Sequence, residues 1–424
     1  MLRLKSVFRF RRLAAFAMAA LFLCGGRFDS AGAGASAARA PQVFCDDAAV
    51  LVANKTDLAA GDVSLQPALR RLLAEADDLL PMKPLSVMDK KQIPPSGDKH
   101  DFISQAPYFW RDTNSPGVKY IRHDGRRNPE AAADSDSGHF QKTCAVAHTL
   151  ALAYYFSGDE RYATKAAELI RVWFLNPATK MNPNLNFGQG IPGQVEGRPA
   201  GLISARGLVH LVDAIGLLAG SKSWAAADQR GMTAWFTEYL HWLTTSKIGR
   251  GELAAKNNHG TYCDTQVVAI SLFLGKTGEA KNVLTAARQK RIARQIEPDG
   301  RQPFELVRTT SFGYGLFNLR ALMDLANLGR CAGVDLWHYQ TADGRSLLKA
   351  TEFMAPYADP SRQWPFQQIH RPNRGDLDEL LLRAAAEYPA SQPIKAGLQF
   401  FKANNQADNP ARLYLKLADT TAAN

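Results

Sequence analysis

From about residue 46 onward the sequence repeats one pattern, in which apolar residues at helical spacing are followed by short polar turns. The clearest case has the i, i+3, i+4, i+7 spacing of an amphipathic helix and consists of Met232, Trp235, Phe236, Tyr239, Leu240 and Leu243. The alternation typical of strands is nearly absent. Spacing and turn residues predict further helices over residues 144–156, 162–174, 202–218, 265–274, 280–295, 314–328, 345–354, 377–387 and 394–402.

Helices of this length joined by short turns predict stacked antiparallel hairpins. Such hairpins form either a solenoid or a closed or nearly closed ring, and no fixed repeat period supports the solenoid. We therefore expect an all-α chain folded as an (α/α) toroid, an incomplete barrel of about six to seven helical hairpins. A length of 424 residues allows two or three domains or one large toroid, and either can bury a large core. With the toroid preferred, residues 38–424 are predicted to form a single domain.

The N-terminus has the pattern of a secretory signal peptide over residues 1–37. A basic start precedes an apolar run over 13–24, which is shorter than the roughly 20 residues of a membrane span. Cleavage sites of the Ala-x-Ala type follow at Ala31-Gly-Ala33 and Ala35-Ser-Ala37. Cys24 leaves a lipoprotein as the alternative, although Leu23 is bulkier than lipidation requires. No later stretch reads as a membrane span, so we expect a periplasmic or secreted protein.

Charge and cysteine content narrow the classes of partner. The net charge of +11 falls to about +5 once the basic N-terminus is set aside, which does not indicate a nucleic-acid-binding protein. The cysteines that would remain, Cys45, Cys144, Cys263 and Cys331, are predicted to be buried thiols with room for one disulfide. The nine histidines show no metal-ligand spacing, so neither a structural zinc site nor a cofactor is expected. The oligomeric state stays open.

Two long stretches interrupt the predicted helices, over residues 104–129 and 176–201. Stretches of this length inside a compact domain are usually functional or disordered, and these are rich in aromatic and amide side chains, which suits sugar recognition. Packing of the loops over the rim of the toroid is the alternative. The candidate substrate contacts in and beyond these loops are Tyr108, Trp110, Asn186, Gln189, Arg198, Asn257 and Arg374.

Two segments carry residues suited to proton transfer. The first is Lys256-Asn257-Asn258-His259-Gly260, where neutral donors and an imidazole precede an apolar helix. Asparagine and glycine also favour helix starts, so a structural role is the alternative. The second segment places Arg308 six residues before Tyr314, and there the alternatives are a surface ion pair and a core ring.

Together these four residues suit β-elimination from a 4-linked uronic acid. The C5 proton becomes acidic only when donors and a cation stabilise the charge that develops on the adjacent carboxylate, a role that Asn258 and Arg308 fit. A base then removes H5 and an acid protonates O4, and His259 and Tyr314 fit these proton transfers. A tyrosine base needs a lowered pKa, and we expect Arg308 and His259 to lower it.

Short motifs spread over much of the chain are Ala106-Pro-Tyr-Phe-Trp110, Asp124-Gly125, Asn128-Pro-Glu130, Trp173-Phe174, Met181-Asn-Pro-Asn184, Lys256-Asn-Asn-His-Gly260, Pro298-Asp-Gly300, Glu305-Leu306, Arg308-Thr309 and Tyr314. In these motifs the chain resembles the alginate lyase superfamily of (α/α) toroid polysaccharide lyases, most closely the alginate and glucuronan lyases of polysaccharide lyase family thirty-eight. The resemblance spans about residues 101–365 and implies that Asn258 and Arg308 bind the uronate carboxylate, with His259 and Tyr314 at the positions of the catalytic histidine and tyrosine. Gly260-Thr261 and Arg111 depart from the patterns of relatives.

The stereochemistry of the elimination does not decide which polyuronate is the substrate. In mannuronate and glucuronate H5 and O4 leave from the same side, so Tyr314 could serve as base and then acid, whereas guluronate needs a base on the opposite face, for which His259 is the candidate. One rival function is a glycoside hydrolase, which needs a pair of carboxylates such as Asp264, Glu305 or Asp299. The other is a non-catalytic periplasmic polysaccharide-binding protein, which has no need of Tyr314.

Overall fold

The computed structural model describes residues 40–115, 117, 119–132, 135–401 and 407–418, and these belong to one compact unit, Ala40–Asn424. The predicted signal peptide, residues 1–37, lies outside the described residues. The helices are α1 (Ala48–Ala59), α2 (Gln66–Leu79), α3 (Asp136–Ser157), α4 (Glu160–Ile170), α5 (Leu208–Leu217), α6 (Ala226–Thr245), α7 (Lys247–Leu253), α8 (Asn258–Phe273), α9 (Thr277–Ala287), α10 (Ala293–Gln295), α11 (Pro303–Leu306), α12 (Ser311–Cys331), α13 (Leu347–Met354), α14 (Gly375–Glu387) and α15 (Gln392–Leu398).

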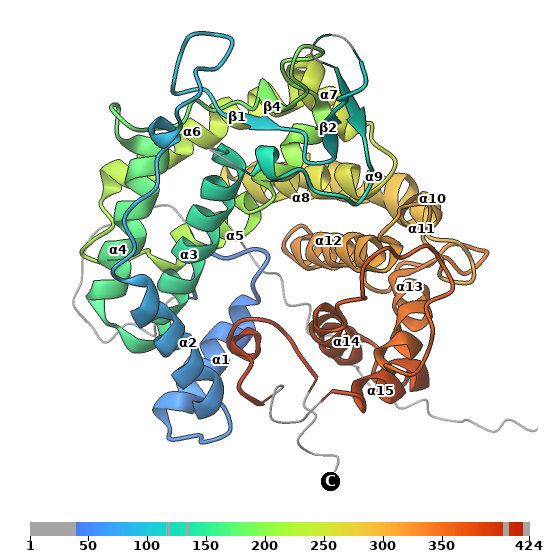
Figure 1. Cartoon of the computed structure of the whole chain (residues 1–424). Helices are drawn as coiled ribbons and strands as arrows, with labels where there is room; N and C mark the ends of the chain where they lie inside the picture. Colours follow the sequence, from blue (N-terminus) through green and yellow to red (C-terminus); the bar gives the residue numbers. More distant parts are fainter. Residues whose placement is uncertain (1–39, 116, 118, 133–134, 402–406, 419–424) are drawn as a thin grey trace, which may run out of the picture. The chain divides into compact units, whose positions relative to one another are not determined.

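The helices pack as a row of neighbours that follows the chain (Figure 1). In this row α3 packs against α5, α5 against α8, α8 against α12, and α12 against α14, while α4, α9, α13 and α15 each pack on a member of the row. Because α8 and α12 have neighbours on several sides, most of their residues are buried, whereas α6 buries only the predicted apolar face that carries Met232 and Trp235. The observed packing is that of helical hairpins around a common core, as the sequence predicted.

Three predicted helices differ from the observed ones in a way that packing explains. α3 begins eight residues before the predicted start at 144, since Ser135 caps it and accepts from Ser137 N. The predicted helix 202–218 divides into a 3-10 segment, Pro199–Ala205, and α5. A Cβ on Gly201 would lie 2.5 Å from the backbone of Gly188, so this segment lies too close to a strand for regular side chains. The predicted helix 280–295 is α9 and α10 with a π-helical turn between them.

The two long stretches predicted as loops contain short strands. β1 (Ile103–Gln105) pairs in parallel with β4 (Phe187–Gly190), and β2 (Phe109–Arg111) pairs antiparallel with β3 (Tyr120–Arg122). The β1–β4 pair therefore joins the two stretches to each other, and β1, β2 and β4 lie near α7 at the upper edge of Figure 1.

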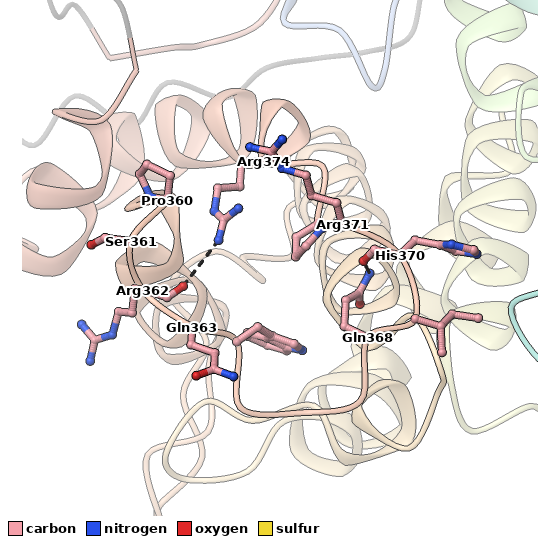
Figure 2. A pocket seen from close by; sticks show the side chains of 11 residues that line it. Pro360, Ser361, Arg362, Gln363, Gln368, His370, Arg371 and Arg374 are labelled. Carbon is pink, nitrogen blue, oxygen red and sulfur yellow. Dashed lines mark hydrogen bonds between the residues drawn. The ribbon is translucent and has the colours of Figure 1, made fainter.

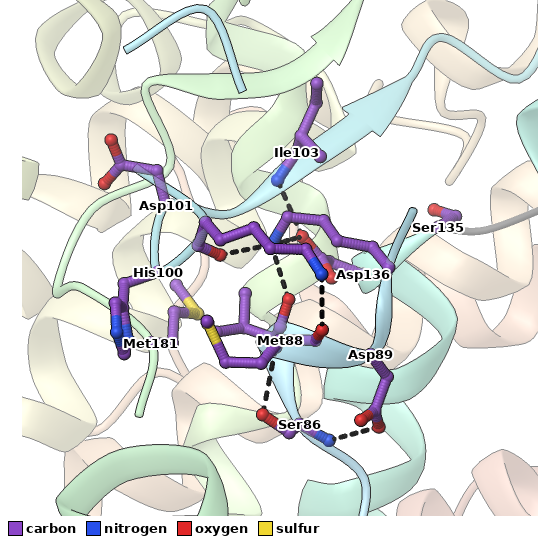
Figure 3. Close-up of polar contacts among 12 residues, drawn as sticks. Ser86, Met88, Asp89, His100, Asp101, Ile103, Ser135, Asp136 and Met181 are labelled. Carbon is purple, nitrogen blue, oxygen red and sulfur yellow. Dashed lines mark hydrogen bonds and ion pairs between the residues drawn. The ribbon is translucent and has the colours of Figure 1, made fainter. Parts of the chain in front are cut away.

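A buried ion pair anchors the segment that leads into β1 to the first residue of α3 (Figure 3). Lys90 Nζ lies 3.0 Å from Asp136 Oδ2, and both side chains are almost fully inaccessible to solvent. The same ammonium donates to the carbonyls of Val87 and Lys99, and Asp136 accepts from Ile103 N at the start of β1. A buried charge that is paired and hydrogen-bonded in this way holds one local geometry.

Two further sequence predictions concern the cysteines and the possible membrane spans. The four cysteines are free thiols, as the simpler interpretation had it, but Cys331 is exposed rather than buried. Residues Pro199–Leu217, which the sequence analysis did not single out, are long and apolar enough to cross a membrane by length and composition alone. This stretch is 67% buried inside the fold, as expected of a core helix.

Candidate active site

The first turn of α8 presents Asn258, and a buried glutamate fixes its orientation. Asn258 N and Asn258 Nδ2 both donate to the Glu305 carboxylate, each at 2.7 Å. Asn258 and Glu305 are each only 1% exposed, and burial raises the pKa of Glu305. The Asn258 carbonyl oxygen Oδ1 is buried without a hydrogen-bond partner in the described part of the chain. One N–H of the amide thus holds Glu305, and the other is left for a ligand.

His259 follows on the same turn and is oriented by a second carboxylate. His259 Nδ1 lies 2.6 Å from Glu252 Oε1, and Glu252 is 2% exposed on α7. A carboxylate acceptor requires that Nδ1 carries the proton, which leaves the lone pair of the neutral imidazole on Nε2. No described residue is bonded to Nε2, and the side chain is 21% exposed, so Nε2 can accept a proton from a ligand.

A buried arginine clamps the loop between α7 and α8. Arg291 donates to both oxygens of Asp264 and to the carbonyls of Ala255 and Leu253. A Cβ on Gly260 would lie 2.2 Å from Ala255 O and 2.3 Å from Arg291 Nη1. Glycine is therefore required at position 260 by its close approach to this guanidinium, and this requirement holds whatever the substrate.

Arg308 and Tyr314 follow Glu305 in the chain and contact each other. Arg308 N donates to Glu305 O, so the short helix α11 and the residues after it carry both groups that border Asn258. Arg308 Nη2 donates to Tyr314 Oη at 2.8 Å, and its guanidinium carbon lies 3.7 Å from the centre of the tyrosine ring. Tyr108 Oη lies 2.7 Å from Tyr314 Oη. The phenol oxygen of Tyr314 therefore has two partners before any substrate binds.

Arg308 is not a free cation, because Asp124 binds it. Nε and Nη2 of Arg308 donate to the Asp124 carboxylate at 2.7–3.1 Å, and Thr309 donates to the same carboxylate from its backbone and its hydroxyl. Burial acts against ionisation, but the bonds from Arg308 and Thr309 prevail and lower the pKa of Asp124 to about 2. Arg308 Nη1 has no hydrogen-bond partner among the described residues and can still donate to a ligand.

The expected lowering of the tyrosine pKa was wrong for the substrate-free protein. Burial is the largest influence and raises the pKa of Tyr314 well above its usual value near 10, and the neighbouring Tyr108 raises it further. Arg308 acts in the predicted direction but is outweighed. The phenol is therefore protonated at neutral pH, which is the form of a general acid.

Of the predicted substrate contacts, Tyr108 is the hydrogen-bond partner of the candidate catalytic residue Tyr314. Gln189 and Arg198 bind each other, since Arg198 donates to the main-chain and side-chain oxygens of Gln189. Gln189 has φ of +48°, a left-handed conformation that is uncommon outside glycine, and its N–H is held by Ser104 Oγ. These two residues form a fixed polar pair on β4 and the loop that follows it.

The remaining predicted contacts are distributed around the site. Trp110 donates to Arg126 O, and Asn186 accepts from Trp242, so both take part in packing at the rim of the fold. Asn257 precedes the first residue of α8, and its carbonyl accepts from Gln295. These contacts involve only the backbone of Asn257, so the role of its side chain in substrate binding stays a prediction.

Arg374 lies in a separate basic cavity of about 500 Å³ (Figure 2). The cavity is formed within residues 360–374, and its polar lining includes Arg362, Gln363, Gln368, His370, Arg371 and Arg374. The same segment is bonded to the catalytic loop, because Ile369 N donates to Thr309 O and Ser311 N donates to Gln367 O. The cavity is therefore connected through the backbone to the residue that follows Arg308.

The three carboxylates considered for a hydrolase are committed to other partners. Asp264 is buried against Arg291, Glu305 is held by Asn258, and Asp299 is an exposed partner of Arg301. A glycoside hydrolase needs two carboxylates that flank the bond to be broken, one as acid and one as base or nucleophile. None of the three is left free to act in such a pair.

Sequence reasoning missed the residues that orient the predicted ones. Asp124, Glu252 and Arg291 were not site candidates, and Glu305 was considered only for hydrolysis. The one signal for Asp124 was its place in the Asp124-Gly125 motif, and Gly125 has φ of +72° with its Cβ position 2.4 Å from Thr309 Oγ1. That contact brings the Asp124 turn against the Arg308-Thr309 segment, which no local pattern predicts.

Comparison with known proteins finds similarity to alginate lyases over most of the chain. The alginate lyase family model matches residues 86–364. A crystal structure of an alginate lyase from Bacteroides ovatus is 39% identical, with 88% of this chain and 98% of that chain covered and a TM-score of 0.83. Among curated proteins, none matches this chain.

Two more distant structures share the fold. Alginate lyase A1-III from Sphingomonas species A1 is 18% identical, with 87% of this chain and 95% of that chain covered and a TM-score of 0.56. A histidine-to-alanine variant of that enzyme, complexed with a tetrasaccharide, is 16% identical over the same shares, with a TM-score of 0.55. The family model covers well over half of the chain, and the Bacteroides relative nearly all of the described part. The chain therefore belongs to the alginate lyase family and is a polysaccharide lyase with an (α/α) toroid fold.

Proposed function

We propose that this protein cleaves a 4-linked polyuronate by β-elimination and leaves 4,5-unsaturated uronate ends. The substrate is alginate, especially its mannuronate, or glucuronan, as in polysaccharide lyase family thirty-eight. The observation that carries the proposal is the set of hydrogen bonds that orient the four candidate catalytic side chains. Glu305 holds Asn258, and Glu252 holds His259. Asp124 holds Arg308, which in turn donates to Tyr314. Family membership and the Bacteroides alginate lyase support the same polymer class.

In this proposal the carboxylate of the substrate binds between Asn258 and Arg308. The second N–H of the Asn258 amide and the Nη1 group of Arg308 are the free donors, and both stabilise the charge that develops when H5 leaves. Asp124 holds the rest of the guanidinium in place, so Arg308 presents Nη1 in a fixed direction. Glu305 does the same for Asn258.

Proton transfer is assigned to Tyr314 and His259. Tyr314 starts as a phenol and is the acid that protonates O4, since burial raises its pKa. For guluronate, His259 Nε2 removes H5 from the opposite face. For mannuronate and glucuronate, Tyr314 must first lose its proton to solvent, and Arg308 and Tyr108 are bonded to the resulting phenolate. The phenolate then removes H5 and passes that proton to O4 as the C4–O4 bond breaks.

The basic cavity at residues 360–374 is proposed to bind further uronates of the same chain. Arg362, His370, Arg371 and Arg374 contribute positive charge, and arginine pairs with carboxylates through two parallel hydrogen bonds. The remaining predicted contacts, Trp110, Asn186, Gln189, Arg198 and Asn257, are proposed to line the approach. We also propose that residues 1–37 direct export to the periplasm or beyond and that residues 38–424 form the mature catalytic domain.

The test is ultraviolet absorbance of the mature protein mixed separately with polymannuronate, polyguluronate and glucuronan. A rise establishes the double bond and names the polymer, whereas new reducing ends without a rise would contradict elimination. The dependence of the turnover rate on pH then indicates which residue is the base. Turnover on mannuronate or glucuronan should increase with pH, because the phenolate fraction of Tyr314 grows about tenfold per pH unit below its pKa. Turnover on guluronate should not follow that slope.

A further inference from the structure

A second group of titratable side chains lies outside the proposed active site. Asp46, in the segment before α1, meets His148 on α3 and His210 on α5, and one ligand atom from each lies within 4.8 Å of the others. His148 Nε2 is 2.7 Å from Asp46 Oδ2, and the two imidazole ring centres are 5.3 Å apart. Asp46 and His148 are buried, and the ring nitrogen Nδ1 of His210 is closed to solvent.

Two atoms of this group lack the partners that burial requires. Asp46 Oδ1 and His210 Nδ1 have no hydrogen bond to any described residue. Leaving one buried polar group unsatisfied is costly, and most such groups in folded proteins are paired with protein or an ordered ligand. Two unsatisfied atoms on neighbouring side chains therefore indicate that something else belongs between them.

The group stands on a rigid scaffold. The Asp213 carboxylate, one turn after His210 on α5, accepts hydrogen bonds from the backbone of Phe44, Cys45 and Asp46 at 2.7–2.9 Å. These bonds fix the Asp46 backbone relative to α5. Asp213 also brings a second carboxylate next to Asp46, and such a concentration of buried acid favours a cation.

We propose that Asp46, His148 and His210 bind a divalent transition metal ion, zinc foremost, with a water molecule in the fourth position. Two imidazoles and a carboxylate are ligands that zinc accepts in tetrahedral sites, where bonds of about 2.0–2.1 Å set ligand atoms roughly 3.3 Å apart. The observed spacing of 2.7–4.8 Å brackets that value. The metal takes the place of the direct His148–Asp46 hydrogen bond and uses the unsatisfied atoms.

The role of the ion is structural. It joins the segment before α1 to α3 and α5, which are distant in sequence, and this distance explains why the sequence predicted no zinc site. Asp46 and His148 are 102 residues apart, so no short ligand motif exists. The inference does not depend on the proposed substrate.

The test is the metal content of tag-free mature protein by plasma mass spectrometry. We expect about one zinc per chain, lost on dialysis against a strong chelator and regained with added zinc. The His210→Gln variant should lose the metal, and His241→Gln, which changes an exposed histidine of α6, should keep it. Cobalt loaded into the chelated protein should give the visible absorption of tetrahedral coordination, and His210→Gln should abolish it.

A measurement on wild-type protein covers the case in which His210→Gln does not fold. A metal at a hundred times its Kd should raise the Tm of a chain of this length by about 3 °C relative to the chelated protein. The proposal is overturned if purified protein holds no stoichiometric metal and zinc leaves the Tm of the chelated protein unchanged. It is also overturned if His241→Gln loses the metal as His210→Gln does. These outcomes leave the lyase activity assay untouched, so the two proposals fail separately.

Discussion

Replacing Glu252 by glutamine tests whether the buried carboxylate prepares His259 for proton transfer. Glu252 Oε1 lies 2.6 Å from His259 Nδ1, and Glu252 is buried, so the hydrogen bond is short and charge-assisted. Glutamine keeps the shape and offers a carbonyl acceptor, but it removes the negative charge. It also offers an NH₂ group that would favour the tautomer with its lone pair on Nδ1, turned away from the substrate.

The size of the effect follows from the bond that is lost. A hydrogen bond to a charged group contributes about 1.5–3 kcal/mol, and each 1.36 kcal/mol is a factor of ten in rate. If the bond acts mainly in the transition state, kcat should fall by about 10- to 150-fold. The fall should be largest on guluronate, where His259 is the proposed base.

The assay is the initial rate of ultraviolet absorbance increase on each polymer, with folding checked by circular dichroism. Glu279→Gln is the matched control, because Glu279 is exposed and only 3.5 Å from Lys276 in a surface ion pair. In a His259→Gln background, Glu252→Gln should have no further effect on kcat. A Glu252→Gln enzyme that turns over guluronate within threefold of wild type would refute this account of His259.

Three further predictions concern the scaffold of the site. Gly260→Ala should destabilise the fold by about 1–3 kcal/mol, because its Cβ would overlap Ala255 O and Arg291 Nη1. The control Gly278→Ala, which has open space around its Cβ position, should not destabilise the fold. Thermal unfolding of both variants measures the difference. Lys90→Met should lower the free energy of unfolding by about 3–5 kcal/mol, because it removes the ammonium from the buried Asp136 carboxylate. The control Lys276→Met, in an exposed pair, should lower it by less than about 1 kcal/mol. Equal denaturation midpoints for the two variants would contradict a stabilising buried pair. Because the pKa of Asp124 is lowered to about 2, its pair with Arg308 should stabilise the fold fully above about pH 4. That contribution should be lost as the pH falls towards 2. The Asp124→Asn variant should therefore show a smaller fall of Tm with decreasing pH than the wild type.

Hydrophobic periodicity predicted the helices well because their burial repeats along the chain. The face that carries Met232, Trp235 and Phe236 is buried within α6, which spans Ala226–Thr245. Boundaries were less predictable, since they depend on contacts between elements. The 3-10 segment Pro199–Ala205 follows from a close approach of Gly201 to Gly188, which no window of the sequence contains.

In the candidate site, too, short sequence segments predicted the reactive residues but not the distant residues that bind them. Asn258, His259, Arg308 and Tyr314 could be proposed because their chemistry is visible in short segments, and their roles stay predictions. In the structure Asn258 is bonded to Glu305, and Arg308 is bonded to Tyr314. Their partners are far away in sequence, since Arg308 binds Asp124 across 184 residues and Tyr314 binds Tyr108 across 206. Burial also reversed the expected shift of the Tyr314 pKa, and burial of one side chain depends on the whole fold.

The central claim is that the phenol of Tyr314 transfers the proton in the elimination, and the Tyr314→Phe variant tests it most directly. Phenylalanine keeps the ring against Arg308 and removes only the hydroxyl. The ultraviolet rate on the preferred polymer should fall by about 10²- to 10⁴-fold with little change in Tm. Tyr357→Phe, in the helical turn after α13, should retain the wild-type rate. A Tyr314→Phe enzyme that forms the unsaturated product within threefold of the wild-type rate would contradict the account.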